Sequence, residues 1–185
     1  WYPVLASWEV QSAPVGITRL GEQIVVWRNQ NGQVQALEDR CPHRGARLSM
    51  GWNLGDRIAC WYHGVEVGGS GEVKSVPAVD RCPLVGQQCV RSYNVQEAHG
   101  AIFLWFGVTA DQTPEPLSFP QELADSESYS HFLCTAAWNC NYQYALENVM
   151  DPMHGTYLHS SSHSMAEGDR QAEMVLQPTQ TGFTF

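Results

Sequence analysis

The sequence predicts an α+β chain, in which an all-β region is followed by a region that mixes a helix with strands. Three observations lead to this prediction. Residues 1–108 hold short apolar segments separated by Gly and Asn turn signals, which is typical of antiparallel β-structure. Residues 109–123 contain three prolines and suit a linker. A helix-like apolar pattern follows at residues 141–151.

The strands of the first region are predicted in the following order. The segments QIVVWRN (23–29) and QVQALED (33–39) are joined through an Asn-Gly pair, which is a strong hairpin signal. RIACWYH (57–63) is the next strand candidate. VEVGGSGEVKSV (65–76) predicts a hairpin that turns at its glycines. VRSYNVQEAHGAIFLWFG (90–107) predicts two strands around a His-Gly turn.

The second region is less regular. FLCTAAWN (132–139) predicts a strand, and NYQYALENVMD (141–151) predicts a helix that the following proline disturbs. SSSHSMAEGDRQ (160–171) predicts a polar loop. MVLQP (174–178) and TGFTF (181–185) predict the opening strands of a further sheet. Because the chain starts without Met and stops within a strand pattern, we expect it to be a portion of a longer polypeptide.

Composition and charge argue against some classes of function. Ten Lys and Arg residues against 19 Asp and Glu residues give a net charge of −9. Such a surface repels the phosphate backbone of nucleic acids. No apolar run reaches the roughly 18 residues that cross a membrane. We therefore expect neither nucleic acid nor a membrane as a partner.

The six cysteines fall into two groups. Cys41 and Cys60 have histidines at metal-ligand spacing, which favours a metal and a reducing compartment such as the cytoplasm. The others show no such pattern, and we interpret them as small apolar fillers. These are Cys82, Cys89, Cys134 and Cys140.

The stretch CPHRGARLSMGWNLGDRIACWYHG (41–64) holds two Cys-His pairs, Cys41 with His43 and Cys60 with His63. Two short loops with this content can hold a metal centre between them. The same four side chains suit a tetrahedral zinc site. They also suit a [2Fe–2S] cluster, in which two thiolates bind one iron and two imidazoles bind the other. Glycines beside the histidines favour the cluster, because they allow tight loops whose backbone N–H groups face sulfide.

CPHRG and CWYHG match the two-loop signature of the Rieske family, which the sequence here closely resembles. The resemblance implies that the four side chains bind a [2Fe–2S] cluster. Respiratory Rieske proteins carry an extra cysteine in each loop, whereas Ala46 and the pair Trp61-Tyr62 stand at those places. The chain is therefore similar to the soluble oxygenase and ferredoxin branch. Val65 departs from many ring-hydroxylating oxygenases, which have Trp after the second His-Gly pair.

A second constellation lies in ALENVMDPMHGTYLHSSSH (145–163). Two histidines and a carboxylate on one face of an iron leave positions open for O2. Asp151 and His154 are predicted to share a helical face. His154 and His159 can meet one metal only if the helix ends or distorts between them, which Gly155 permits. On spacing alone, these histidines can equally be ordinary hydrogen-bonding residues near a helix end.

Together the motifs resemble the oxygenase α subunit of Rieske non-haem iron oxygenases, which include the aromatic ring-hydroxylating dioxygenases. The resemblance implies that His154 and His159 bind a mononuclear Fe(II). It makes Asp151 the catalytic carboxylate that links the iron to the cluster of a neighbouring subunit, and it places Asn148 in the surroundings of the iron. The carboxylate ligand of the iron is expected beyond Phe185.

The resemblance also implies an activity and an organisation. Electrons from NAD(P)H would arrive through a reductase or ferredoxin, and O2 would hydroxylate an organic, most often aromatic, substrate. Dioxygenation, monooxygenation and demethylation share these motifs. Residues 1–110 would form the Rieske [2Fe–2S] domain. Residues 111–185 would form a linker and the start of an α+β catalytic domain with an antiparallel sheet.

The resemblance implies an oligomer, and two other functions stay open. By resemblance, head-to-tail homotrimers would bring cluster and iron together. One alternative is a Rieske ferredoxin-like electron carrier without catalytic iron. Another is a zinc-stapled binding module. Arg44 and Arg47 either steer an acidic redox partner or pack and bond within the loops, and the sequence favours neither reading.

Overall fold

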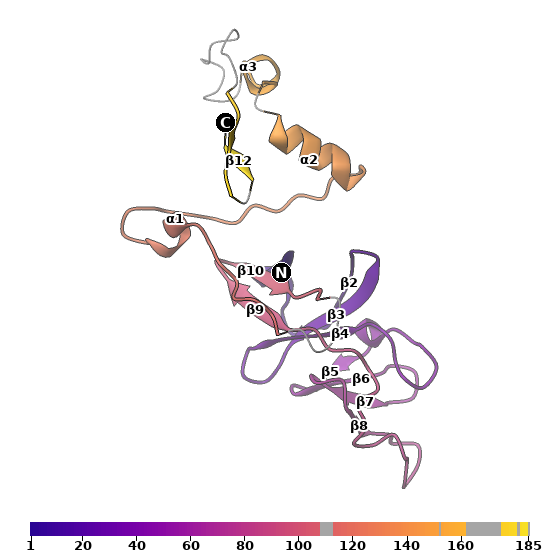
Figure 1. Ribbon diagram of the computed structural model, residues 1–185. Helices are drawn as coiled ribbons and strands as arrows, with labels where there is room; N and C mark the ends of the chain where they lie inside the picture. Colours follow the sequence, from indigo (N-terminus) through magenta and orange to yellow (C-terminus); the bar gives the residue numbers. More distant parts are fainter. Residues whose placement is uncertain (108–112, 152, 162–174, 181, 185) are drawn as a thin grey trace. The chain divides into compact units, whose positions relative to one another are not determined.

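The computed structural model describes residues 1–107, 113–151, 153–161, 175–180 and 182–184. They belong to two compact units, residues 1–135 and residues 136–185. The first unit contains strands β1 to β10, and the second contains helices α2 and α3 with the hairpin β11–β12 (Figure 1). The predicted α+β class, with an N-terminal β-region, is confirmed.

The first unit consists of short elements. Its strands are β1 (Tyr2–Ala6), β2 (Val15–Arg19), β3 (Glu22–Arg28), β4 (Val34–Glu38), β5 (Trp52–Asn53), β6 (Arg57–Ala59), β7 (Glu66–Gly68), β8 (Val73–Ser75), β9 (Val95–Ala98) and β10 (Ala101–Leu104). Its helical turns are η1 (Ser7–Glu9), η2 (Leu48–Met50) and α1 (Gln121–Ala124).

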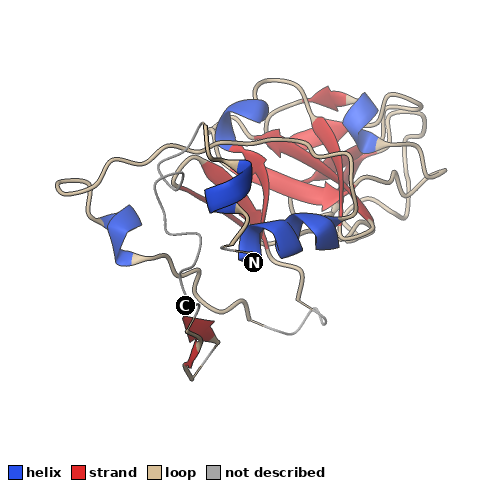
Figure 2. Ribbon diagram, turned by 90° about the horizontal axis from the view of Figure 1, so that it is seen from above, coloured by secondary structure: helices blue, strands red, loops and turns tan. Residues whose placement is uncertain are grey.

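Three antiparallel sheets build this unit, in the orders β2-β3-β4, β1-β10-β9 and β5-β6-β7-β8. Figure 1 shows β9 and β10 on one side of β3 and β4, with β5 to β8 on the other, and Figure 2 shows the strands gathered together. The Tyr93 N–H donates to the Ala36 carbonyl at 3.0 Å, which links β4 to the chain before β9. The β2–β3–β4 sheet has a hydrophobic core on each face.

Residues 24–27 of strand β3 are all apolar, because both faces of the strand are buried. Val25 and Trp27 face a core that includes Ile58, whereas Ile24 and Val26 face another that includes Ile102. Successive side chains of a strand point to opposite faces, so a strand that is buried on both sides needs apolar residues throughout.

The predicted hairpins of the first unit are confirmed. The Asn29 carboxamide oxygen accepts the N–H groups of Asn31 and Gln33, each at 2.9 Å, and thereby shapes the first turn. His99 and Gly100 both have positive φ, which the tight turn between β9 and β10 requires. The strand predicted at 57–63 is shorter, because β6 ends at Ala59 and the chain then turns.

The strand predicted at 132–139 is wrong. These residues form no strand, and Phe132 is 85% exposed. The part of the predicted linker that the structure describes belongs to the first unit and contacts other residues of it. Trp1 Nε1 donates to the Glu115 carbonyl at 2.6 Å, and the Phe119 ring lies 4.5 Å from the ring of His99. The division between residues 110 and 111 stays a prediction.

The second unit contains α2 (Tyr142–Met150), α3 (Gly155–Leu158), β11 (Gln177–Pro178) and β12 (Phe183–Thr184). The predicted helix is confirmed, and its first turn is capped by the Asn141 side chain, which accepts the Gln143 N–H at 3.0 Å. Most of the polar loop predicted at 160–171 lies outside the described residues.

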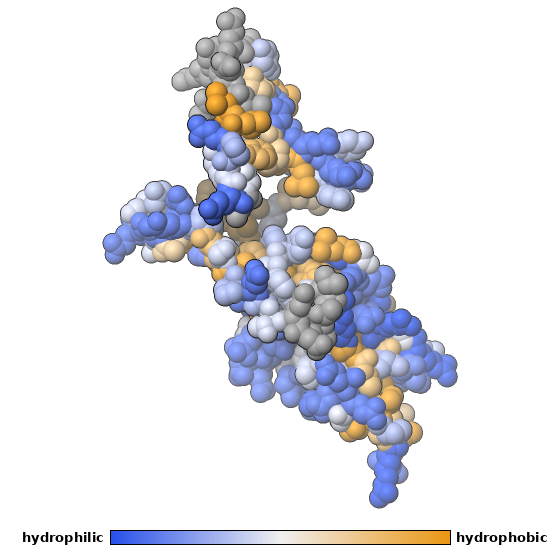
Figure 3. Space-filling view, in the orientation of Figure 1, coloured by the Kyte–Doolittle hydropathy of each residue, from blue (hydrophilic) through white to orange (hydrophobic). Residues whose placement is uncertain are grey.

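The surface of this unit contains exposed apolar side chains, among them Leu146 and Val149 of α2. Figure 3 shows several hydrophobic residues, in orange, on the surface of this unit. Cys134 and Cys140 are exposed, so their interpretation as small apolar fillers is wrong. None of the helices in the described parts of the chain is long and apolar enough to span a membrane.

Candidate functional site

Two loops of the first unit share one backbone design. Loop 1 (residues 41–46) follows β4, and loop 2 (residues 60–65) joins β6 to β7. The Cys41 N–H donates to the Ala46 carbonyl, and the Cys60 N–H donates to the Val65 carbonyl, each at 2.8 Å. In each loop the N–H of the glycine four residues after the cysteine donates back to the cysteine carbonyl, at 2.9 Å. The two loops are therefore matched turns.

Glycine is needed at the same place in both loops. Gly45 and Gly64 have φ angles of +71° and +70°, a region that other residues enter only at a cost. The Cys-to-Gly spacing is four in both loops, although the histidine comes two residues after Cys41 and three after Cys60. Sequence reasoning missed this common spacing, which the aligned glycines could have revealed.

The two cysteines lie on the inner side of the loops. Cys41 is 3% exposed and Cys60 is 1% exposed, and both belong to the core beneath the loops. Burial raises the pKa of the Cys41 thiol to about 11, although the His43 and Arg44 N–H groups donate to its sulfur. The Cys60 thiol raises this pKa further, which shows that the two thiols are neighbours.

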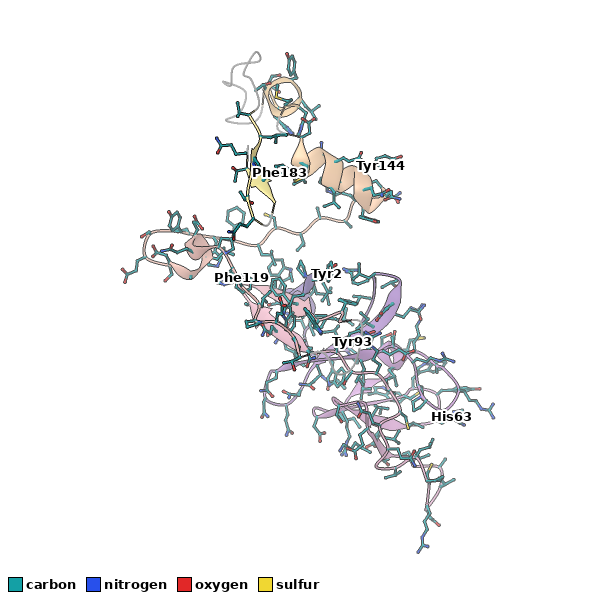
Figure 4. All side chains as sticks on the ribbon, in the orientation of Figure 1. Tyr2, His63, Tyr93, Phe119, Tyr144 and Phe183 are labelled. Carbon is teal, nitrogen blue, oxygen red and sulfur yellow. The ribbon has the colours of Figure 1, made fainter. Side chains whose placement is uncertain are left out.

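The two histidines lie on the outer side. The rings of His43 and His63 are 4.7 Å apart between centroids, and both residues are exposed. Tyr62 packs against His63 with ring centroids 4.0 Å apart. Figure 4 shows His63 at the periphery of the first unit, whereas Tyr93 lies closer to its middle. The structure therefore brings the four predicted side chains together as an inner thiol pair and an outer imidazole pair.

Asp39 anchors the base of loop 1, and sequence reasoning missed it. Its carboxylate accepts the Ser49 N–H at 2.7 Å and the Ser49 hydroxyl at 2.6 Å, which ties together the two ends of the segment that holds loop 1. Asp39 is 2% exposed. A buried carboxylate needs such donors. An acidic residue just before the first loop was the signal in the sequence.

The donor set of the two loops fits a two-iron cluster. Within the described residues, no three His, Cys, Asp or Glu side chains form a group suited to a single metal ion. A Rieske cluster takes two thiolates on one iron and two imidazoles on the other, so it needs two pairs. A tetrahedral zinc site needs four ligands around one ion. The inner and outer pairs match the first requirement.

The second constellation has a different geometry from the predicted one. Helix α2 ends at Met150, and Asp151 is already extended, with φ −89° and ψ 105°. Asp151 and His154 therefore do not share a helical face, which corrects the prediction. The residue before a proline is disfavoured in the helical region, and Pro152 follows Asp151 in the sequence.

A single helical turn separates the two histidines. His154 precedes α3 and His159 follows it, and their rings are 5.4 Å apart between centroids. Gly155 is the first residue of α3 and does not break a helix. The chain thus brings the histidines together by ending α2 before both of them. An iron held there would need a further ligand, because a facial triad has three.

Asp151 contacts His154 in two ways. Its carbonyl oxygen lies 2.7 Å from His154 Nδ1, and its carboxylate oxygen lies 3.6 Å from the same nitrogen. A carbonyl only accepts hydrogen bonds, so Nδ1 is the protonated nitrogen and the Nε2 lone pair is available to a metal. Asn148 lies on the last turn of α2, and its carbonyl accepts the Asp151 N–H at 3.4 Å.

Two family models match the chain. A model for the Rieske [2Fe-2S] domain matches residues 1–94, and a model for the vanillate O-demethylase oxygenase C-terminal domain matches residues 138–185. A curated relative, the vanillate O-demethylase oxygenase subunit of Pseudomonas sp. (strain HR199 / DSM 7063), is 35% identical over 169 residues. The match covers 91% of this chain and 47% of the relative.

Solved structures resemble the chain as well. Dicamba monooxygenase bound to dicamba matches with a TM-score of 0.75 and 32% identity, over 86% of this chain and 47% of that chain. The reduced complex between oxygenase and ferredoxin in carbazole 1,9a-dioxygenase matches with a TM-score of 0.59 and 34% identity, over 68% of this chain and 33% of that chain. The chain spans about half the length of its curated relative, and half or less of these structures.

Proposed function

The chain belongs to the Rieske non-haem iron oxygenase family, and we propose that it takes electrons through a [2Fe–2S] cluster to a mononuclear Fe(II), activates O2 and hydroxylates an organic substrate. One observation carries the proposal. The two matched loops place a thiol pair inside and an imidazole pair outside, upstream of a second histidine pair 5.4 Å apart. When bound, the cluster supplies one-electron transfer and the iron supplies oxygen activation.

Each cluster residue has a distinct task in this proposal. Cys41 and Cys60 would hold the inner iron in the core, where water is excluded. His43 and His63 would hold the outer iron at the surface, so electrons would enter and leave on the imidazole side. The His43 and Arg44 N–H groups already point at the Cys41 sulfur and would stabilise its thiolate form.

The iron residues divide their tasks in a similar way. His154 and His159 would bind the iron, with His154 using Nε2. Asp151 would hold His154 in that tautomer and orientation, as carboxylates do beside metal-binding histidines. We place Asn148 beside this group, because its carbonyl is bonded to the Asp151 N–H at 3.4 Å. The third iron ligand, a carboxylate, would come from residues outside the described set.

The class of substrate rests on the relatives. Their names refer to vanillate, dicamba and carbazole, all of which are aromatic compounds. We propose a small aromatic substrate, and a product assay with labelled O2 would show whether one or two oxygen atoms enter it. We also propose a homotrimer, a reductase or ferredoxin as electron donor, and a cytoplasmic location.

The domain assignment follows from the same proposal. Residues 1–110 would form the Rieske [2Fe–2S] domain. Residues 111–185 would form the linker and the first part of the catalytic domain. The family matches at residues 1–94 and 138–185 support this arrangement.

Replacement of His154 by Ala in the full-length protein tests the proposal. An oxygenase should lose about one of roughly three irons per chain, together with turnover, and should keep acid-labile sulfide and the EPR signal of the reduced cluster. A Rieske electron carrier would keep all its iron. His131→Ala is a matched control, because it removes an exposed histidine of the first unit that belongs to neither site. Unchanged iron and turnover in His154→Ala would refute the catalytic role of this residue.

A further inference from the structure

The positive charges of this acidic chain are unevenly neutralised. Four described cations have carboxylate partners, and these pairs are Arg28 with Glu97, Arg57 with Glu66, Lys74 with Glu72 and Arg91 with Glu22. Among the described residues, Arg40, Arg44 and Arg47 lie beside or within loop 1 without a carboxylate in ion-pair contact, and all three are exposed. Arg19 and Arg81 also lack such a carboxylate, so three of the five described cations without an ion pair gather at loop 1, one of the two cluster loops.

Arg40 and Arg44 line a continuous groove along loop 1. One depression of about 710 Å³ also touches Arg91 and Tyr93, and an adjoining one of about 510 Å³ also touches His43. The two depressions share Glu38, Arg40, Arg44 and Gly45. The groove thus leads from the end of β4 to the imidazole side of the cluster site.

The acidic residues of this groove are mostly engaged. Glu22 accepts hydrogen bonds from Arg91 and from the Tyr93 hydroxyl. Asp39 is buried and bonded to Ser49. Glu38 is half-buried. Its carboxylate also lines both depressions, but Arg40 and Arg44 outnumber it, so the groove keeps a net positive charge and favours an anionic surface.

Loop 2 has the opposite character. Trp61 and Tyr62 are 45% and 50% exposed, and their rings stack with centroids 5.7 Å apart. Trp52 of the neighbouring strand is 58% exposed. The imidazole pair therefore lies between a cationic flank on loop 1 and an aromatic flank on loop 2. A partner that is recognised by charge will meet the cluster from the loop 1 side.

We propose that the loop 1 groove, which Arg40 and Arg44 line and which Arg47 follows in the sequence, docks an acidic electron-transfer protein that reduces the cluster on its His43 side. The proposal rests on the proposed function, since it assigns the entry face for the electrons of that reaction. One electron leaves the reduced iron–sulfur centre of the partner, which is oxidised, and arrives on the cluster, which is reduced. No bond forms or breaks.

The test measures reduction of the cluster in the full-length protein by a reduced acidic plant-type [2Fe–2S] ferredoxin in stopped flow. Salt is varied from about 10 mM to about 1 M, over which the Debye length falls from about 30 Å to about 3 Å. The wild-type rate constant should fall at least about tenfold over this range, because attraction between opposite charges is screened.

The variants separate docking from folding. Arg44→Glu should lower the rate constant at low salt by about tenfold and flatten its salt dependence, and Arg44→Gln should have a smaller effect. Both keep the Arg44 N–H that points at the Cys41 sulfur. Lys74→Glu is the matched control, because it makes the same charge change at a cation already paired with Glu72. It should stay within about twofold of wild type.

Each other outcome overturns the proposal. Equal losses in Arg44→Glu and Lys74→Glu would assign the effect to net charge. A wild-type rate that is independent of salt, or no reduction by ferredoxin when dithionite reduces the cluster, would exclude an acidic partner at this face. Absence of a Rieske EPR signal from the wild-type protein would refute the proposed function itself, and it is seen before any kinetics.

Discussion

The two candidate metal sites are built in different ways. In the first unit, the four candidate ligands come from two loops that are 19 residues apart, Cys41 to Cys60. The loops extend from two different sheets, and a core that both cysteines share brings them together. In the second unit, Asp151, His154 and His159 come from one short segment around a single helical turn. The first site depends on tertiary structure, whereas the second is placed by the local path of the chain.

The two candidate metal sites also differ in how deeply their surroundings are buried. Cys41 and Cys60 are almost fully buried within a core of the first unit. Next to the second site, Leu146 and Val149 of α2 are 57% and 71% exposed. A site that shares atoms with a packed core is rigid, because core side chains are held by many contacts. We therefore expect damage to the first site to affect folding and damage to the second to affect chemistry alone.

Cys60→Ser in the full-length protein should have the largest effect, because it should impair both the cluster and folding. The substitution should abolish the cluster, with loss of acid-labile sulfide and of the EPR signal, and it should leave a buried hydroxyl that costs about 1–3 kcal/mol if it is unpaired. Iron and sulfide analysis with thermal unfolding measures both effects. Cys82→Ser, at a partly buried cysteine outside both loops, should keep the cluster.

Asp151→Asn should have the next largest effect, and it should affect the second site alone. The Asp151 carbonyl and carboxylate both lie near His154 Nδ1, so the carboxylate helps to orient this imidazole. Loss of its charge should reduce turnover by about 10–100-fold while cluster content stays at the wild-type level. Turnover assays and EPR of the same sample measure this. A lost cluster signal would show that the two sites are not separable.

The four side chains that the structure brings together in the first unit could be predicted from the sequence, because they lie in two short motifs. The hairpins are also predicted, since Asn-Gly, Gly-rich and His-Gly turns act locally. The matched hydrogen bonds of the two loops were not predicted. They depend on a common Cys-to-Gly spacing, which is hidden by the different positions of His43 and His63.

The errors have physical causes too. The segment 132–139 has strand-like composition, but a strand needs a partner, and the described residues offer none there. The expected break at Gly155 was misplaced, because Asp151 already leaves the helix before Pro152. Asp39 stands just before loop 1 in the sequence, but its partner could not be predicted, because only the fold of loop 1 brings Ser49 near the carboxylate.

The two loops of the first site can also be compared with each other through their glycines. Gly45→Ala and Gly64→Ala should each cost about 1–2 kcal/mol, because an alanine is forced into the left-handed region. The two losses should be similar, since the new methyl group would lie 3.4 Å from a ring carbon of Pro77 in Gly64→Ala and 3.4 Å from Nε of Arg40 in Gly45→Ala, and neither contact is a clash. Urea unfolding measures this. Asn tolerates the left-handed region, so Gly45→Asn should be milder than Gly45→Ala. Equal losses in Gly45→Asn and Gly45→Ala would show that backbone strain is not the cause.

The smallest expected effect concerns the frame that holds the first site. Arg28 donates to Glu97 at 2.6 and 2.9 Å, and this hydrogen bonding lowers the pKa of the Glu97 carboxyl. Glu97→Gln should cost no more than about 1 kcal/mol at pH 7, because the pair is partly exposed. Glu72→Gln removes a single-contact pair and should cost less.

The pH dependence of this last loss has a definite sign. The folded-state pKa of Glu97 is depressed, so its contribution is fully present above the unfolded-state pKa of about 4.3 and is lost as the pH falls through the folded-state value. The difference in unfolding free energy between wild type and Glu97→Gln should therefore be constant from pH 7 to about pH 5 and should vanish in stronger acid. A difference that persisted there would mean that the Glu97 side chain stabilises the fold by packing, and that its ion pair with Arg28 contributes nothing to the frame beneath the cluster loops.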